Sequence, residues 1–171
     1  MPEIIDLGSV RDRNRIELAT SRGRSIPNAR RAELISEVLA AGRQLVLDNH
    51  PSAQLRSLTG TYNCFGMAFA NRRTCIEPIH VQMILDDDGY KEISPQDVMP
   101  GDIVIYRDNR GEVSHVAVVV LHEPDVANAK WKTTVLSQWG AQGEYVHDHL
   151  DVHQMLGTPD KFYSERRIAT A

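Results

Sequence analysis

Apolar residues recur at three- and four-residue spacing along the first third of the chain. This pattern predicts an amphipathic helix over about residues 27–49, which Pro27 opens and Pro51 ends. The apolar positions of this helix are Leu34, Ile35, Val38, Leu39, Leu45 and Val46. Residues 1–25 are polar and show little periodicity, which indicates a loosely ordered basic arm followed by one domain over residues 26–171.

A second segment, Phe65–Ala70, is apolar or small on nearly every side. It predicts a buried helix over about residues 64–72, with Thr61 or Asn63 as its N-cap. Residues 50–60 are expected to form a loop. A short third helix is expected over residues 78–85, before a polar turn at residues 86–90.

The second half of the chain has the pattern of β-strands. Strands are expected at residues 103–107, 113–122, 133–139 and 144–147, with a hairpin turn at residues 108–111. Phe162 and Tyr163 are expected to pack back on the sheet. Helices come first and an antiparallel meander second, which favours an α+β fold with the helices packed on one face of the sheet.

Composition and charge limit the classes of function. The chain has 171 residues, 42% hydrophobic residues and a formal net charge of −4, which is typical of one globular domain. Neither nucleic acid nor a membrane is expected as a partner, because the net charge is negative and no apolar run approaches the ~20 residues that span a bilayer. Eight arginines lie within residues 11–43, either as a solvated arm or as a docking patch for an acidic protein partner.

Cysteine content and the N-terminal sequence bear on location. Two cysteines, Cys64 and Cys75, are too few for a disulfide scaffold. The first residues lack the pattern of a cleavable signal peptide. We therefore expect a cytoplasmic protein with reduced thiols, or one exported by a secretion system that needs no signal peptide.

The candidate chemistry centres on Cys64 and His115. Cys64 stands at the predicted start of the second helix, where free N–H groups and the helix dipole favour a thiolate. His115 interrupts an otherwise apolar strand, and its imidazole could act on that thiol. The alternatives are a small buried core residue for Cys64 and a satisfied core histidine for His115. We interpret Cys75 as structural.

A third group should orient the imidazole, and the next strand offers Gln138 and Ser137. We favour Gln138, because an amide oxygen accepts well from an imidazole N–H. In a regular strand Ser137 points to the opposite face. Gln138 is alternatively a polar residue at the sheet edge.

A metal site is the main rival hypothesis. His149 and His153 would share one face of a helix and could bind zinc. The neighbouring Leu150, Val152 and Leu156 indicate packing instead, so we expect neither a metal nor another cofactor. No glycine-rich phosphate loop is present in the sequence.

Three motifs together resemble the papain-like cysteine peptidases and amidases of the NlpC/P60 and CHAP group. They are Asn63-Cys64-x3-Ala68, then Met99-Pro100-Gly101-Asp102-Ile103-Val104-Ile105-Tyr106, then Val113-Ser114-His115-Val116-Ala117-Val118, and the resemblance covers about residues 60–140. It implies a papain-like fold with Cys64 as nucleophile, His115 as general base and Gln138 or Ser137 as the orienting residue. It also implies a role for Tyr62 or Asn63 beside the oxyanion.

The expected function is therefore a cysteine hydrolase that cleaves an amide bond through an acyl-enzyme. The expected substrate is a peptide or a peptidoglycan stem peptide, for a secreted toxin or effector amidase or for a defence-associated peptidase. An acyltransferase that uses the same cysteine is the nearest chemical variant. A non-catalytic binding module, which docks a partner through the arginine-rich arm, is the alternative from another class.

Overall fold

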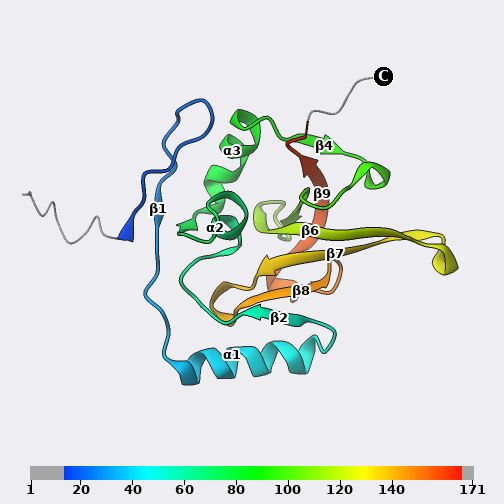
Figure 1. Cartoon of the computed structure of the whole chain (residues 1–171), viewed down its shortest axis with the longest axis horizontal. Helices are drawn as coiled ribbons and strands as arrows, with labels where there is room; N and C mark the ends of the chain where they lie inside the picture. The colour runs from blue at the N-terminus through cyan, green and yellow to red at the C-terminus, as the bar shows by residue number, and fades with distance from the viewer. Residues whose placement is uncertain (1–13, 167–171) are drawn as a thin grey trace, which may run out of the picture.

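A computed structural model describes residues 14–166 as a mixed α+β protein (Figure 1). Its centre is a seven-stranded sheet of strand order β2-β8-β7-β6-β5-β9-β4, in which every neighbouring pair is antiparallel. A second sheet pairs β1 with β3. The helices are α1 (Ser36–Asn49), α2 (Cys64–Phe69) and α3 (Val81–Asp87). The strands are β1 (Asn28–Ala29), β2 (Gln54–Ser57), β3 (Cys75–Ile76), β4 (Lys91–Ile93), β5 (Ile103–Arg107), β6 (Val113–Asp125), β7 (Lys130–Gln138), β8 (Glu144–Asp148) and β9 (Thr158–Ser164).

The two faces of the large sheet carry separate apolar clusters. Side chains alternate between the faces of a strand, and directly paired residues share a face. Ile105 pairs with Val116, and both belong to the cluster that contains the α2 residues Cys64 and Phe65. We call this side the helix face. The other side, which we call the far face, carries a cluster that includes Val104, Tyr106, Ala117, Val119 and Val135.

Helices α2 and α3 cover the helix face, where Phe65, Val81, Ile84 and Leu85 are buried. The short helix α2 lies very close to β3. A Cβ atom built on Gly66 would come 1.6 Å from the carbonyl oxygen of Thr74, so only glycine fits at that position. This close contact fixes α2 against the segment that leads into β3.

Helix α1 differs from the sequence prediction in length and in position. Residues 28 and 29 are extended and pair with β3, so the helix begins at Ser36 rather than near Pro27. Its buried residues are Leu39 and Val46, and Val46 joins Trp139 and Tyr145 at the β2–β8 end of the sheet. Tyr145 pairs with Ser137 on the far face, so the expectation that all helices pack on one face is wrong. The other predicted apolar positions of this helix are exposed: Leu34, Ile35, Val38 and Leu45.

The predicted strands are present, and the described residues form five more that the sequence did not indicate, β1, β2, β3, β4 and β9. Strand β2 occupies part of the expected loop at residues 50–60 and pairs with β8. Strand β9 lies between β5 and β4, so the segment around Phe162 is an inner strand of the sheet. Strands β6 and β7 extend past the sheet as a two-stranded ribbon, which is visible at the right of Figure 1.

Residues 14–25 of the expected arm are bound to the domain. Arg24 forms two hydrogen bonds of 2.6 Å to the carboxylate of Asp87, and the hydroxyl of Thr20 donates a third. Ala19 and Ser25 form a β-bridge. The expectation of a loosely ordered arm is therefore wrong for residues 14–25, and residues 1–13 lie outside the described part of the chain.

Candidate functional site

Cys64 is the first residue of α2, as the sequence predicted. The side chain of Asn63 accepts a hydrogen bond of 2.9 Å from the N–H of Gly66, which makes Asn63 the N-cap. The Asn63 amide also bonds both the N–H and the carbonyl oxygen of Ile76. Asn63 therefore joins the start of α2 to β3 through its side-chain amide.

The environment of Cys64 disfavours a thiolate in this arrangement. Burial raises the pKa of its thiol to about 12. The backbone N–H groups of Val116, Phe65 and Cys64 itself oppose this effect and favour the thiolate. Burial outweighs these N–H groups and holds the proton on the sulfur.

His115 lies on the far face. It pairs with Tyr106, and the two rings meet edge to face with their centroids 5.1 Å apart. Its side chain is 1% exposed, and its Nε2 is buried without a hydrogen-bond partner within residues 14–166. Burial, together with the nearby His147, lowers the pKa of His115 to about 3, so the ring is neutral.

The sheet therefore separates the two residues that the sequence brought together as a catalytic pair. Cys64 packs on the helix face, whereas the ring of His115 packs on the far face. The pairing of β6 with β7 begins at Val118 and Leu136, so residues 113–117 of β6 are not paired with β7. Helix α2 contacts both strands. The N–H of Val116, the residue after His115, favours the thiolate of Cys64.

Gln138 and Ser137 point to opposite faces, as predicted for neighbouring strand residues. Gln138 pairs with Glu144, which binds Arg72 and Tyr62 from the loops around α2, so Gln138 shares the side of the sheet with Cys64. Its Nε2 donates to the carbonyl oxygens of Thr59 and Gly140, which leaves its Oε1 buried without a partner in the described chain.

Ser137 belongs to a hydrogen-bonded group on the far face. Its Oγ lies 2.7 Å from Nε2 of His147 and accepts a hydrogen bond from the indole N–H of Trp139. His147 also contributes to the electrostatic environment of His115. Gln138 is thus the triad candidate on the side of Cys64, and Ser137 is the candidate on the side of His115.

Tyr62 belongs to a buried ion-pair cluster that the sequence did not indicate. Its hydroxyl donates to Glu144 at 3.0 Å, and Arg72 makes two hydrogen bonds to the same carboxylate at 2.8 and 3.0 Å. Arg72 has a left-handed backbone conformation with φ of 65° in the turn that follows α2, and its side chain reaches Glu144. This cluster fixes the hydroxyl of Tyr62, the residue for which the resemblance implied a role beside the oxyanion.

The second histidine group does not form the arrangement that a metal would need. Residues 149–153 form no helix, so His149 and His153 do not share a helix face. Within residues 14–166 no three His, Cys, Asp or Glu side chains converge as a possible metal site. Cys75 is a buried free thiol whose sulfur lies 3.8 Å from the carbonyl oxygen of Thr61.

The fold and the site define a mixed α+β protein with a buried helix-start cysteine and, on the other side of the sheet, a buried neutral histidine. Comparisons found no matching protein-family model, curated protein or solved structure. Among the described helices, none has the length and apolar character needed to cross a bilayer.

Proposed function

We propose that the protein is a cysteine hydrolase of papain-like type that cleaves an amide bond, with Cys64 as its nucleophile. The position of Cys64 carries this proposal. It is the first residue of a capped helix, and the backbone N–H groups of α2 and of Val116 lower the pKa of its thiol. Such groups stabilise a thiolate, and they also stabilise the oxyanion that forms when a thiolate attacks a carbonyl carbon.

Catalysis requires a rearrangement that brings the imidazole of His115 to the sulfur. Residues 113–117 of β6 pair with β5 but not with β7, so this part of the strand lacks a neighbour on one side. Nε2 of His115 and Oε1 of Gln138 are buried without hydrogen-bond partners in the described chain. Buried polar atoms without partners cost free energy, so both atoms favour a state in which they gain one.

In that active state His115 takes the proton of Cys64, and the thiolate attacks the carbonyl carbon of the amide. His115 then protonates the leaving amine, and water hydrolyses the thioester. Oε1 of Gln138 accepts the second imidazole N–H. An amine that replaces water would give the acyltransferase variant of the same chemistry.

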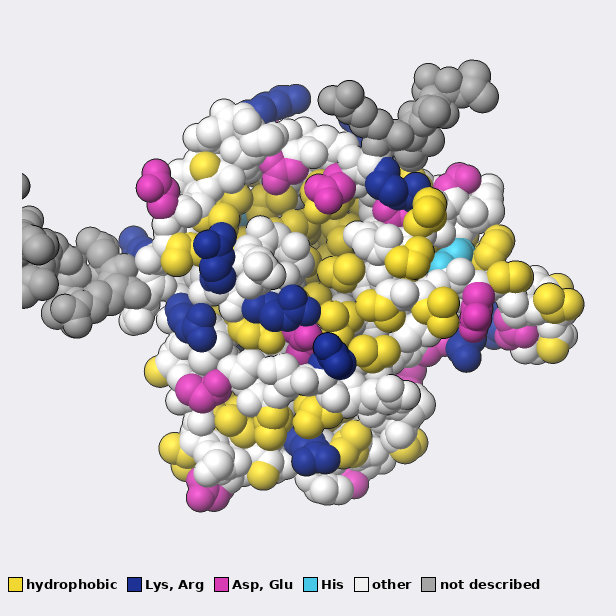
Figure 2. Space-filling model, in the orientation of Figure 1, with side chains coloured by type: hydrophobic (Ala, Val, Ile, Leu, Met, Phe, Trp, Pro, Cys, Tyr) yellow, Lys and Arg dark blue, Asp and Glu magenta, His cyan; other side chains and the backbone are white. Residues whose placement is uncertain are grey.

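The surface around α2 supports a peptide or a peptidoglycan stem peptide as substrate. Lys and Arg side chains gather around the position of α2 (Figure 2), and Arg72 is 41% exposed although it is paired with Glu144. Arg30 extends to the carbonyl oxygen of Arg73 nearby. Peptides that carry carboxylates complement such a surface. The settings consistent with this chemistry are an exported toxin or effector and a defence-associated peptidase.

Mass spectrometry of peptide and peptidoglycan fragments incubated with the protein tests this function. We expect the wild-type protein and Cys75→Ala to cleave the same amide bond, and Cys64→Ala and His115→Ala to leave it intact. Cys75→Ala is the matched control because it removes the other buried thiol. Cleavage that persists in Cys64→Ala would refute the proposed nucleophile.

A non-catalytic binding module is the second candidate. The opposite placement of Cys64 and His115, together with a thiol pKa of about 12, favours it. The rate at which iodoacetamide alkylates Cys64 at pH 7 distinguishes the two candidates. It is measured with and without a substrate or its uncleavable analogue. A hydrolase would react faster with the analogue bound and would lose this acceleration in His115→Ala. A binding module would react slowly in every case.

A further inference from the structure

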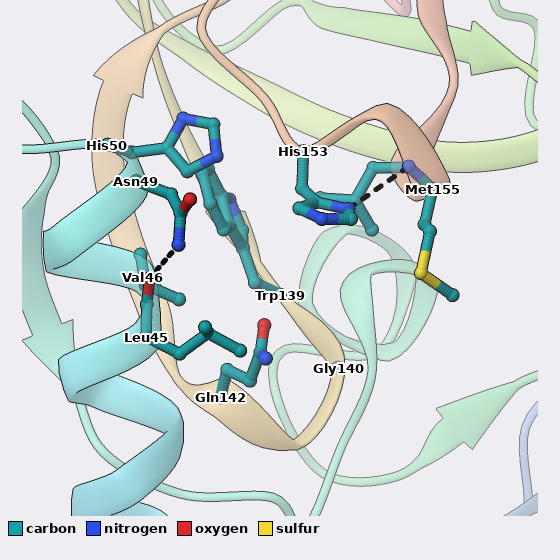
Figure 3. Close-up of a pocket in the computed structure, with 10 residues that line it drawn as sticks. Leu45, Val46, Asn49, His50, Trp139, Gly140, Gln142, His153 and Met155 are labelled. Atoms are coloured by element: carbon teal, nitrogen blue, oxygen red, sulfur yellow. Dashed lines mark hydrogen bonds between the residues drawn. The ribbon is translucent and has the colours of Figure 1, made fainter.

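The far face of the molecule contains a pocket that the cysteine chemistry does not use. It has a volume of about 280 Å³ and lies between the end of α1, the turn at Gly140–Gln142 and the turn at Gln154–Leu156 (Figure 3). Its walls are mostly apolar and include Leu45, Val46 and the indole of Trp139. The volume is just below the ~300–1,000 Å³ of most small-molecule sites, which suits a single ring-sized group.

His50 is the polar side chain at one end of this pocket. Its Nδ1 lies 2.6 Å from Oδ1 of Asp151, and the hydroxyl of Ser52 donates to the other carboxylate oxygen at 2.8 Å. A carboxylate only accepts hydrogen bonds, so Nδ1 carries a proton, and in the neutral form of the imidazole Nε2 is an acceptor. His50 is 9% exposed, and Figure 3 shows its second ring nitrogen on the side of the pocket toward His153.

The aromatic wall of the pocket is held in place independently of any ligand. The indole N–H of Trp139 donates to Ser137 at 2.9 Å, and the ring of His50 meets the indole edge to face with centroids 4.8 Å apart. The side-chain amide of Gln142 enters from the opposite end of the pocket (Figure 3). The site thus offers a fixed acceptor, an aromatic surface and a second polar group.

We propose that this pocket binds a phenolic ring whose hydroxyl donates a hydrogen bond to Nε2 of His50. The ring packs between Trp139 and the α1 side chains Leu45 and Val46. The group para to the hydroxyl points to Gln142 or to the open mouth of the pocket, where Met155 is 81% exposed. A free phenol and a tyrosine side chain of a peptide share this chemistry. The proposal does not depend on the reactivity of Cys64.

Nuclear magnetic resonance of the Trp131→Phe variant tests the proposal, because Trp139 is then the only tryptophan. We expect p-cresol to shift the Trp139 indole N–H signal in a saturable manner. 4-Methylanisole has the same ring without the hydroxyl proton and should bind about tenfold more weakly, the effect of one lost hydrogen bond. N-acetyl-tyrosinamide distinguishes the sources: tighter binding than p-cresol indicates a tyrosine side chain, and weaker binding indicates a free phenol.

Two variants on α1 locate the binding. Leu45→Trp fills the pocket and should abolish the p-cresol shift, whereas Val38→Trp is the matched control. Both positions are about half exposed, but Val38 does not line the pocket, so Val38→Trp should bind p-cresol as before. Because each variant adds a tryptophan, assigned backbone amide signals of residues 139–142 serve as the readout here. Equal affinity for p-cresol and 4-methylanisole, or binding that survives Leu45→Trp, would overturn the proposal.

Discussion

His115 packs its ring against Tyr106, with 5.1 Å between the ring centroids, on the face of the sheet opposite to Cys64. This contact buries a histidine that has an unpartnered nitrogen and a pKa lowered to about 3. Burial of His115 therefore lowers the free energy of unfolding of the domain. Such costs occur at functional sites, where a residue is kept for its chemistry rather than for stability.

Replacing His115 with leucine should raise the free energy of unfolding by about 1 kcal/mol, because it removes an unsatisfied buried polar atom. The pH dependence should change as well. As pH falls from 6.5 toward about 3, the unfolded wild-type chain binds a proton that folded His115 does not, so stability falls. Urea denaturation at pH 7 and pH 4 would measure both effects. His115→Gln is the control: it should lose this part of the pH dependence without the gain in stability.

The Glu144 cluster should contribute to stability. Glu144→Gln removes the charge that Arg72 and Tyr62 bind, and we expect it to lower the unfolding free energy by about 1–3 kcal/mol. The matched control is Glu92→Gln, which breaks the exposed pair with Lys161 and should cost less than about 0.5 kcal/mol. Urea denaturation of the two variants compares the pairs, and equal losses would contradict the importance assigned to the buried cluster.

Substitution of alanine for two helical glycines should change the stability of the protein differently. In Gly66→Ala the new Cβ would meet the Thr74 carbonyl oxygen, which should cost about 1–3 kcal/mol or more because backbone must move. In Gly42→Ala the nearest atom, at 3.3 Å, belongs to the flexible side chain of Gln142, so stability should stay equal or rise by up to about 1 kcal/mol. Thermal denaturation followed by circular dichroism would rank the two variants, and a stable Gly66→Ala protein would argue against the close packing of α2 on β3.

The contact between Arg24 and Asp87 should make the stability of the protein depend on pH in the acid range. The Arg24 and Thr20 side chains lower the pKa of Asp87 from 3.8 to about 2. As pH falls from 4 toward 2, the unfolded chain takes up a proton before folded Asp87 does, so the wild-type protein loses stability there. Asp87→Asn should lack this part of the loss, which urea denaturation at pH 4 and pH 2.5 would detect. Arg24→Gln removes the partner and should weaken the same dependence, and an unchanged dependence in both variants would contradict the assignment.

The sequence predicted α2, its cap and the central strands because these segments have strong local signals. Asn63 caps through its own side chain, and β5 and β6 are runs of β-branched residues next to clear turns. The local pattern could not indicate β2 or β9, which are polar or mixed in sequence and form only because neighbouring strands pair with them. The local pattern overestimated the length of α1, because pairing with β3 holds residues 28 and 29 extended.

The same limit applies to the candidate site. Periodicity placed Gln138 and Ser137 on opposite faces, and the structure agrees. The face that His115 occupies depends on its register with Tyr106, which no local pattern encodes. The partners Glu144 and Arg72 are far apart in sequence, and the sequence offered no signal that joins them. His50 and Asp151 were missed for the same reason, since they meet across 101 positions of the chain.

Strand β9 enters the sheet between β5 and β4, although it follows all the other described strands in the sequence. During translation β5 therefore lacks one of its two neighbours until residue 164 has emerged from the ribosome, and β4 lacks a place to attach. The nascent chain can form its α2–β6 contacts early, but the seven-stranded sheet must wait for β9. A copy that lacks β9 would leave one side of β5 unpaired and β4 detached from the sheet.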